Sequence, residues 1–259
     1  MTSPADVLLG FDDMLALIDD RSAALRSAAA EAGMTARVPG CPDWSVHDLV
    51  AHLGEVHLFW SAAVAAGPAD HPPGDDVVGD TQPHGDLLTW SADATARLVA
   101  ALRAAGPGRG CWTWWASTGA PADAGAVARH QVQEAAVHAF DAQEAAGQAE
   151  PVPLRAAADG VGEYLTVELT SNGPWPHDPA RLLLAAGEGG SWLIDLGPDG
   201  ARPTRLAGPD AASGQVAATV TASPSDFVLT VYRRRRPEAL EVTGDSRVLE
   251  RMLDWPNLD

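Results

Sequence analysis

Apolar side chains recur every three or four positions through the first third of the chain, which is the spacing of an amphipathic helix. The first helix is predicted over residues 5–32 and ends at Gly33. Its apolar positions are Val7, Leu8, Phe11, Leu15, Ile18 and Leu25. A second helix is predicted over 45–66, opened by Ser45 with Asp48 three positions later, a variant of the capping box.

Two further helices follow after longer polar connections. Residues 67–85 are rich in Pro, Gly and Asp and predict a loop, which leads into a helix over 86–105. A packed loop over 106–120 carries Trp112, Trp114 and Trp115. The fourth helix is expected over 122–146. Four helices with long connections predict a four-helix bundle.

The pattern changes at Glu150-Pro151-Val152-Pro153, because paired prolines break helices and stiffen linkers. We place the domain boundary there, between residues 1–149 and 150–259. The second domain opens with a predicted helix over 154–170. It continues with strands over 181–185, 191–196, 216–221 and 240–242, and with helices over 224–234 and 245–253. The expected fold is therefore a two-domain α+β protein, with a helical bundle followed by an α+β domain.

Composition narrows the classes of partner. The chain has 259 residues, a net charge of −18 and no lysine, so its surface should repel nucleic acid. The one basic run, 233–236, is too short to reverse this. No apolar run reaches the length of a membrane span and the N-terminus lacks a secretory signal, so we expect a cytoplasmic protein without a membrane partner. Small molecules remain as partners, with the chain as monomer or homodimer.

Two cysteines exclude both a disulfide framework and a four-cysteine zinc site. Cys41 and Cys111 lie far apart in the sequence, and a single disulfide would be unusual in a reducing cytosol. We expect both to be buried small apolar residues.

One histidine of the second predicted helix points into the bundle. At 100° per residue, His52 lies inside an apolar stripe, whereas His47 and His57 fall on the far side or the flank. The stripe consists of Leu49, Leu53, Val56, Phe59, Trp60 and Ala63. A lone histidine on an apolar face is usually a core histidine with its hydrogen bonds satisfied, so His52 alone does not establish a site.

The fourth predicted helix supplies further polar groups. Glu134 and His138 are four residues apart, and His130 and Asp141 share their face with valines and alanines. A buried carboxylate is costly unless it is paired or bound to a metal. We therefore predict a divalent metal, zinc, between His52, Glu134 and His138. Two histidines and a carboxylate with an open fourth position are typical of catalytic zinc.

Other interpretations of this face stay open at this point. E-x-x-x-H also occurs by chance on solvated helix faces. His130 competes with Glu134 as a ligand, since both share the face. Asp141 either forms an ordinary salt bridge or orients a ligating histidine.

Three segments carry a resemblance to a known family. Residues 41–57, CPDWSVHDLVAHLGEVH, resemble the signature of the mycothiol-dependent maleylpyruvate isomerase family, which belongs to the wider DinB-like metalloenzymes. Residues 134–142, EAAVHAFDA, are similar to its second motif. The C-terminal run from SPSDF at 223–227 through VTGD at 242–245 resembles the family's sterol-carrier-like domain.

The resemblance implies that His52, Glu134 and His138 are zinc ligands and that mycothiol is the cosubstrate. It also implies that an arginine of the C-terminal domain reaches the active site. Counting back from Gly244-Asp245 without gaps favours Arg234, and a slip of one residue gives Arg235. The ordinary alternative is a solvated basic end of a helix.

The implied function is that of a thiol transferase or isomerase in which a metal-bound thiolate attacks a small electrophile. Arg234 or Arg235 would hold a substrate carboxylate or stabilise enolate charge, and Asp141 would orient a ligand. The alternatives are a hydrolase or lyase that uses metal-bound water, and a non-enzymatic ligand-binding module. Gln133 replaces the family's common His, and Ala139-Phe140 replaces Arg-Trp. These departures leave the three ligand positions unchanged. They concern which substrate, and which thiol, the protein uses.

Overall fold

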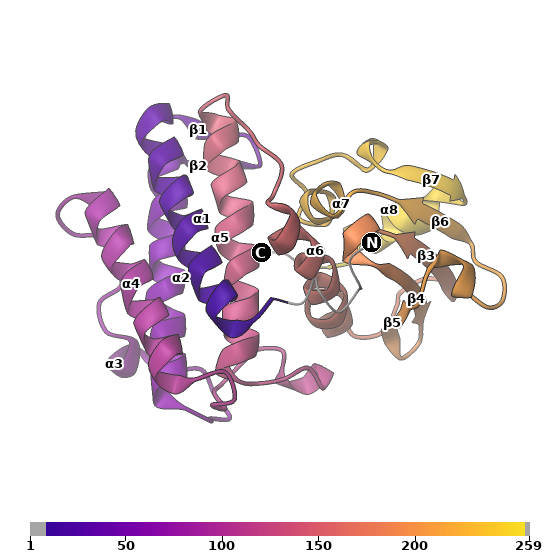
Figure 1. The fold of residues 1–259 in the computed structure, drawn as a ribbon, viewed down its shortest axis with the longest axis horizontal. Helices are drawn as coiled ribbons and strands as arrows, with labels where there is room; N and C mark the ends of the chain where they lie inside the picture. Colours follow the sequence, from indigo (N-terminus) through magenta and orange to yellow (C-terminus); the bar gives the residue numbers. More distant parts are fainter. Residues whose placement is uncertain (1–8, 257–259) are drawn as a thin grey trace. The chain divides into compact units, whose positions relative to one another are not determined.

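The computed structural model describes residues 9–256. It divides between Val152 and Pro153 into two compact units, a helical unit and an α+β unit (Figure 1). The predicted α+β fold class is confirmed.

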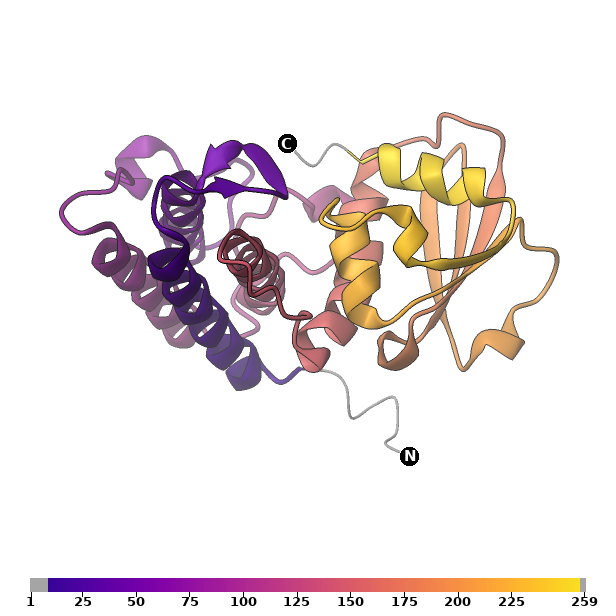
Figure 2. The same cartoon turned by 90° about the horizontal axis from the view of Figure 1, so that it is seen from above.

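The helical unit is a bundle of four long helices, as predicted. These are α1 (Phe11–Ala32), α2 (Val46–Ala66), α4 (Leu87–Ala105) and α5 (Ala124–Ala145). Within it, α1 packs mainly against α5, and α2 packs mainly against α4 (Figures 1 and 2). A short helix, α3 (Asp75–Val78), interrupts the predicted 67–85 loop.

The first helix begins later than predicted. Leu9 and Gly10 precede α1, and the earlier positions Val7 and Leu8 lie outside the described residues. Asp12 and Asp13 occupy the first turn of α1, where negative charge favours a helix start.

The second helix begins at the predicted capping box. The Asp48 amide donates to Ser45 Oγ at 3.3 Å, and the Ser45 amide donates to Asp48 Oδ2 at 2.9 Å. The segment before it forms an antiparallel pair, β1 (Arg37–Val38) and β2 (Cys41–Ser45), for which no strand was predicted. This pair fixes the entry into α2.

By length and composition, α2 is apolar enough to cross a membrane. More than half of its most apolar 18-residue window is buried inside the structure. Leu49 and Leu53 of α2 pack with Leu25 of α1 and Ala139 of α5 in one core cluster. Packing within the bundle thus explains the apolar character of this helix.

The α+β unit holds a mixed five-stranded sheet in the order β5-β4-β3-β6-β7. Its strands are β3 (Ala180–Ala185), β4 (Ser191–Gly197), β5 (Gly200–Leu206), β6 (Ala218–Thr221) and β7 (Glu241–Gly244). Only the β3–β6 pair is parallel among these neighbours. The sequence did not predict β5, which contains Pro203; as an edge strand it accommodates a proline.

The helices of this unit are α6 (Leu154–Glu163), α7 (Pro224–Val231) and α8 (Ser246–Asp254). The predicted helix over 154–170 is continuous but irregular, because α6 leads into a π-helical segment, Tyr164–Glu168, and then a 3-10 turn, Leu169–Asn172.

Candidate metal centre

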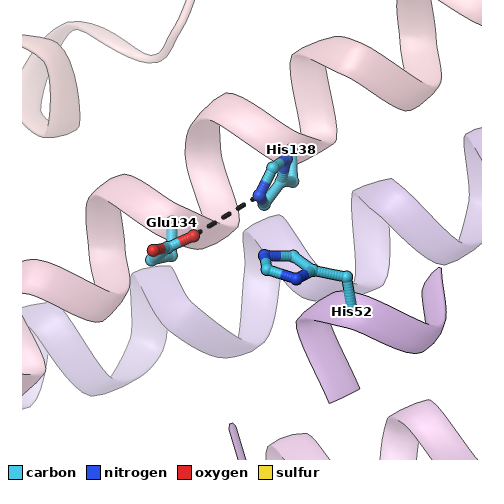
Figure 3. A group of neighbouring side chains, drawn as sticks. All are labelled: His52, Glu134 and His138. Atoms are coloured by element: carbon cyan, nitrogen blue, oxygen red, sulfur yellow. Dashed lines mark ion pairs between the residues drawn. The ribbon is translucent and has the colours of Figure 1, made fainter. Parts of the chain in front are cut away.

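Three potential metal ligands converge in the helical unit. His52 lies on α2, and Glu134 and His138 lie on α5. One ligand atom from each lies within 4.8 Å of the others, and the two rings and the carboxylate point toward one another (Figure 3). Glu134 Oε2 is 3.4 Å from His138 Nε2. Ligands of a tetrahedral zinc with bonds of ~2.1 Å lie about 3.4 Å apart, so the spacing suits one cation.

The surrounding residues explain why these side chains meet. The i, i+4 spacing places Glu134 and His138 one above the other on α5. On α2, Leu49 and Leu53 flank His52 in sequence and are fully buried. His138 is buried, whereas His52 and Glu134 are half-buried. The group is therefore anchored in the core with one side left accessible.

Asp141 fixes the orientation of one imidazole. Its Oδ2 lies 2.9 Å from His138 Nδ1, and its side chain is fully buried. When Nδ1–H donates to this carboxylate, the lone pair of Nε2 faces the centre of the group. Asp141 therefore contacts His138, as the orienting interpretation required.

The cysteines differ from each other. Cys111 is buried as predicted, and burial, with a contribution from Asp123, raises the pKa of its thiol to about 11. Cys41 is only half-buried, so the prediction of a buried apolar residue is wrong for it. Its thiol lies 3.9 Å from Asp141 Oδ2, because β2 carries it to the end of the bundle where Asp141 lies.

The electrostatics of the group favour a cation. Burial alone would raise the pKa of Glu134, but the hydrogen bond to His138 and the nearby charges of His138, His130 and His52 hold it well below its usual range. Burial alone would lower the pKa of His138, but its hydrogen bonds to Asp141 and Glu134 outweigh this and raise it to about 9. Two carboxylates thus hold a positive charge here, and two imidazoles with one carboxylate are a donor set that suits a divalent metal.

His130 contacts the other oxygen of Glu134. Its Nε2 lies 3.7 Å from Glu134 Oε1, and His130 lies one helical turn before Glu134 on α5. The described residues place Glu134 rather than His130 in the converging group. His130 is buried and contacts the carboxylate from the opposite side to His138.

One histidine lies elsewhere than predicted, and one aromatic ring near the group was not predicted. His57 is fully buried rather than on the far side or flank, and its Nδ1 lies 3.2 Å from Thr95 Oγ1. Trp44 was given no role within the motif at 41–57, but its ring centroid lies 4.7 Å from that of His52 and 6.1 Å from that of His138. Its position directly before the helix that carries His52 was the available signal.

The two predicted arginines lie in the α+β unit. Helix α7 ends at Val231, before the predicted end at 234, and Arg233 adopts a φ of 64°. Arg234 donates to the Tyr232 carbonyl at 2.7 Å. Arg235 is exposed and pairs with Asp226 at 2.7 Å. Their part in catalysis stays a prediction.

Comparison with known families covers both units. The model of the mycothiol maleylpyruvate isomerase N-terminal domain matches residues 15–143, and that of the C-terminal domain matches residues 155–251. The chain belongs to this family. The motifs at 41–57 and 134–142 fall within the first match, and the run at 223–245 falls within the second, so the resemblance seen in the sequence is confirmed.

Solved structures of the mycothiol maleylpyruvate isomerase family share the fold. A crystal structure of the mycothiol-dependent maleylpyruvate isomerase is 15% identical, with a TM-score of 0.60 over 94% of this chain and 96% of that chain. A histidine-to-alanine mutant of that enzyme is 16% identical, with the same TM-score and coverage. At these identities the likeness is one of fold. No curated protein matches the chain in sequence.

Proposed function

We propose that this chain is a metal-dependent enzyme that uses a low-molecular-weight thiol, mycothiol, to isomerise or conjugate a small electrophile. The observation that carries the proposal is the convergence of His52, Glu134 and His138 within the helical unit. Membership of the mycothiol maleylpyruvate isomerase family, and the mycothiol dependence named for the solved structures with this fold, support the choice of thiol.

The donor set favours an anionic ligand. A divalent cation held here supplies electrostatic stabilisation of a thiolate near neutral pH. Two neutral imidazoles and one carboxylate leave a net positive site around such a cation, which attracts a thiolate. Asp141 keeps His138 Nε2 directed at the centre through the bond at Nδ1. The Trp44 ring contacts the His52 ring, with centroids 4.7 Å apart.

The covalent chemistry is that of a reversible addition. The thiol sulfur forms a bond to an electrophilic carbon of a double bond, and the electron pair moves toward the adjacent carbonyl as an enolate. Rotation followed by loss of the thiol gives an isomer, whereas proton uptake at the neighbouring carbon gives a thioether. Following the family resemblance, Arg234 or Arg235 stabilises the enolate or a substrate carboxylate.

Two measurements on the purified protein test the proposal. Elemental analysis should find about one divalent ion per chain, as three ligands and one open position require. Turnover of an unsaturated carbonyl compound should then require added mycothiol, with an isomer or a thioether found by mass spectrometry. His47→Ala, an exposed change on the same helix, is the matched control and should alter neither result.

Equal turnover with and without a thiol, and no thioether, would reject the thiol chemistry while leaving the metal site intact. A hydrolase or lyase that uses metal-bound water would then be the better account. Gln133, and Ala139-Phe140, are the positions where this chain departs from the motif, and they motivate this arm of the test.

A further inference from the structure

An aromatic cluster lies beside the candidate metal centre in the helical unit. We define it as Phe59 and Trp60 of α2, His130 of α5, and Trp112, Trp114 and Trp115 of the loop before α5. His130 lies among three indoles, with ring centroids 5.2 Å from Trp115, 5.9 Å from Trp114 and 6.1 Å from Trp60. Trp112 extends the cluster by stacking on Trp60 at 5.9 Å.

Glu134 joins this cluster to the metal centre. One of its oxygens lies 3.4 Å from His138 Nε2 on the metal side, and the other lies 3.7 Å from His130 Nε2 on the cluster side. The indoles around His130 are thus one side chain away from a proposed ligand.

The cluster runs from the core to the surface. Trp115 is fully buried and Trp60 is 4% exposed, so packing alone accounts for both. Trp112 is half-buried, and Trp114 is 39% exposed, one of the few large apolar side chains exposed among residues 9–256. Trp112 and Trp114 therefore leave indole surface at the outer end of the cluster that a ligand can contact.

The loop that presents Trp114 is held firmly. Its two ends pair through a bridge between Gly110 and Asp123. The Trp115 indole donates to the Pro121 carbonyl at 2.8 Å, and the Trp114 ring meets the Trp115 ring edge-on at 5.1 Å. A side chain fixed in this way offers a pre-organised surface at little entropic cost on binding.

We propose that the aromatic cluster binds a planar, uncharged aromatic group of the electrophile, stacked against Trp114, while the reacting carbon lies at the metal centre. This deepens the proposed function and rests on it, since it names the substrate class. Indole faces favour flat rings in offset or edge-on geometry. The phenyl and indole side chains of the cluster carry no positive charge that would hold a carboxylate.

A matched set of unsaturated aldehydes tests the proposal. Crotonaldehyde, cinnamaldehyde and 4-oxobut-2-enoic acid place a methyl, a phenyl or a carboxylate on the same reactive carbon. In each, the thiol sulfur bonds to the β-carbon, the double-bond pair moves to the α-carbon, and that carbon takes the proton lost by the thiol. Each kcat/KM is divided by the rate constant of the uncatalysed mycothiol addition, which removes intrinsic reactivity.

We expect the wild-type protein to prefer the phenyl compound over the other two by at least tenfold after this correction. Trp114→Ala should remove that preference through a higher KM for cinnamaldehyde, with the crotonaldehyde value and the metal content unchanged. Val77→Ala, another exposed apolar residue of the helical unit, is the control and should keep the preference. A wild-type preference for the carboxylate, or an equal loss for all three compounds, would overturn the proposal.

A binding measurement separates this proposal from the proposed chemistry. 3-Phenylpropan-1-ol cannot react with a thiol, and butan-1-ol lacks the ring. In a spectrum of the indole N–H groups, the signal that disappears in Trp114→Phe identifies Trp114. That signal should shift with the phenyl alcohol and not with butanol, even if no thiol reaction occurs. A folded protein in which it does not shift would exclude the aromatic subsite and leave the metal-dependent reaction standing.

Discussion

The ion pairs of α5 in the helical unit differ in burial from the ion pairs of the α+β unit. In the helical unit, the ion pairs of α5 are largely buried, and they share partners: Glu134 contacts two histidines and His138 contacts two carboxylates. In the α+β unit, pairs such as Arg202–Asp199 and Arg247–Asp245 join residues two or three apart in the sequence and are largely exposed.

This difference separates the charges of the candidate metal centre from charges that lie on the surface. An exposed pair contributes ~0–1 kcal/mol, and its loss leaves both partners in water. A buried pair whose members share partners behaves differently, because removal of one group leaves the others uncompensated. The helical unit is therefore where single substitutions should have large and coupled effects.

The largest effect is expected for His138→Ala. It removes one proposed ligand and leaves Glu134 and Asp141 without their shared partner, so the bound metal should be lost and turnover should fall to the uncatalysed rate. Elemental analysis and initial rates measure both. Arg202→Ala in the α+β unit is the control and should change neither. Full metal occupancy in His138→Ala would show that the assigned site is wrong. Loss of metal only in His130→Ala would show that the helix face is right but that His130 is the ligand.

A smaller effect is expected for Asp141→Asn. The variant keeps the shape but removes the charge that orients His138, and such outer partners typically change metal affinity about 10–100-fold. Competition with a chelator measures the dissociation constant. Asp195→Asn, which breaks the half-exposed pair with Arg181, should leave that constant unchanged. An unchanged metal affinity in Asp141→Asn would show that the contact of Asp141 with His138 is an ordinary salt bridge.

The arginine run at 233–236 in the α+β unit is not uniformly exposed like the pairs named above. Arg234 is half-buried, whereas Arg235 is exposed and paired with Asp226. We expect Arg234→Lys to lower kcat about tenfold at unchanged metal content, because a point charge replaces a planar fork. Arg235→Lys should have little effect. The reverse order would assign the role to Arg235, and no effect in either would make both arginines surface charges.

The smallest effect concerns stability against acid. Burial lowers the pKa of His57 to about 3, below its ordinary value near 6.5. The groups that act on it are Thr95 on α4, Arg26 on α1, His52 on its own helix, and Glu134 and His138 on α5. Between pH 6.5 and 3, His57 is protonated in the unfolded chain and neutral in the folded chain. The free energy of unfolding therefore decreases as the pH falls through this range.

Between pH 6.5 and 5.5 this linkage costs about 1 kcal/mol of unfolding free energy. Urea unfolding of the wild type and of His57→Gln at both pH values measures it. Glutamine can retain the hydrogen bond to Thr95 but cannot titrate, so the variant should lose about 1 kcal/mol less over this range. The same loss in both proteins would show that His57 is not the group responsible.

Periodicity predicted the helical unit well because its helices have strong local signals. The capping box at Ser45 and the i, i+4 pair on α5 are readable from spacing alone, and both are present. The site also needs His52, and its contact with α5 is a property of how two helices pack. Helical spacing proposed His52, Glu134 and His138 and left His130 as a competitor, and the family resemblance implied the same three residues, which the structure brings together.

The misses have identifiable causes. His57 was misplaced because α2 is buried on more than one face, so a single apolar stripe underestimates what lies inside. Strand β5 was missed because an edge strand tolerates a proline and polar side chains. The position of Trp44 over two imidazoles depends on the β1–β2 pair, a long-range arrangement that local propensity does not encode.

Because α1 packs mainly against α5, the helical bundle can close only after α5 has been synthesised. The first helix packs mainly against the last helix of its unit. At typical elongation rates of ~5–20 residues per second, on the order of ten seconds separate the completion of the two helices. Between the synthesis of α2 and that of α5, the apolar face of α2 is only partly buried. During the same time His52 lacks the two proposed ligands that α5 supplies. The three proposed ligands can come together only after residue 138 has left the exit tunnel.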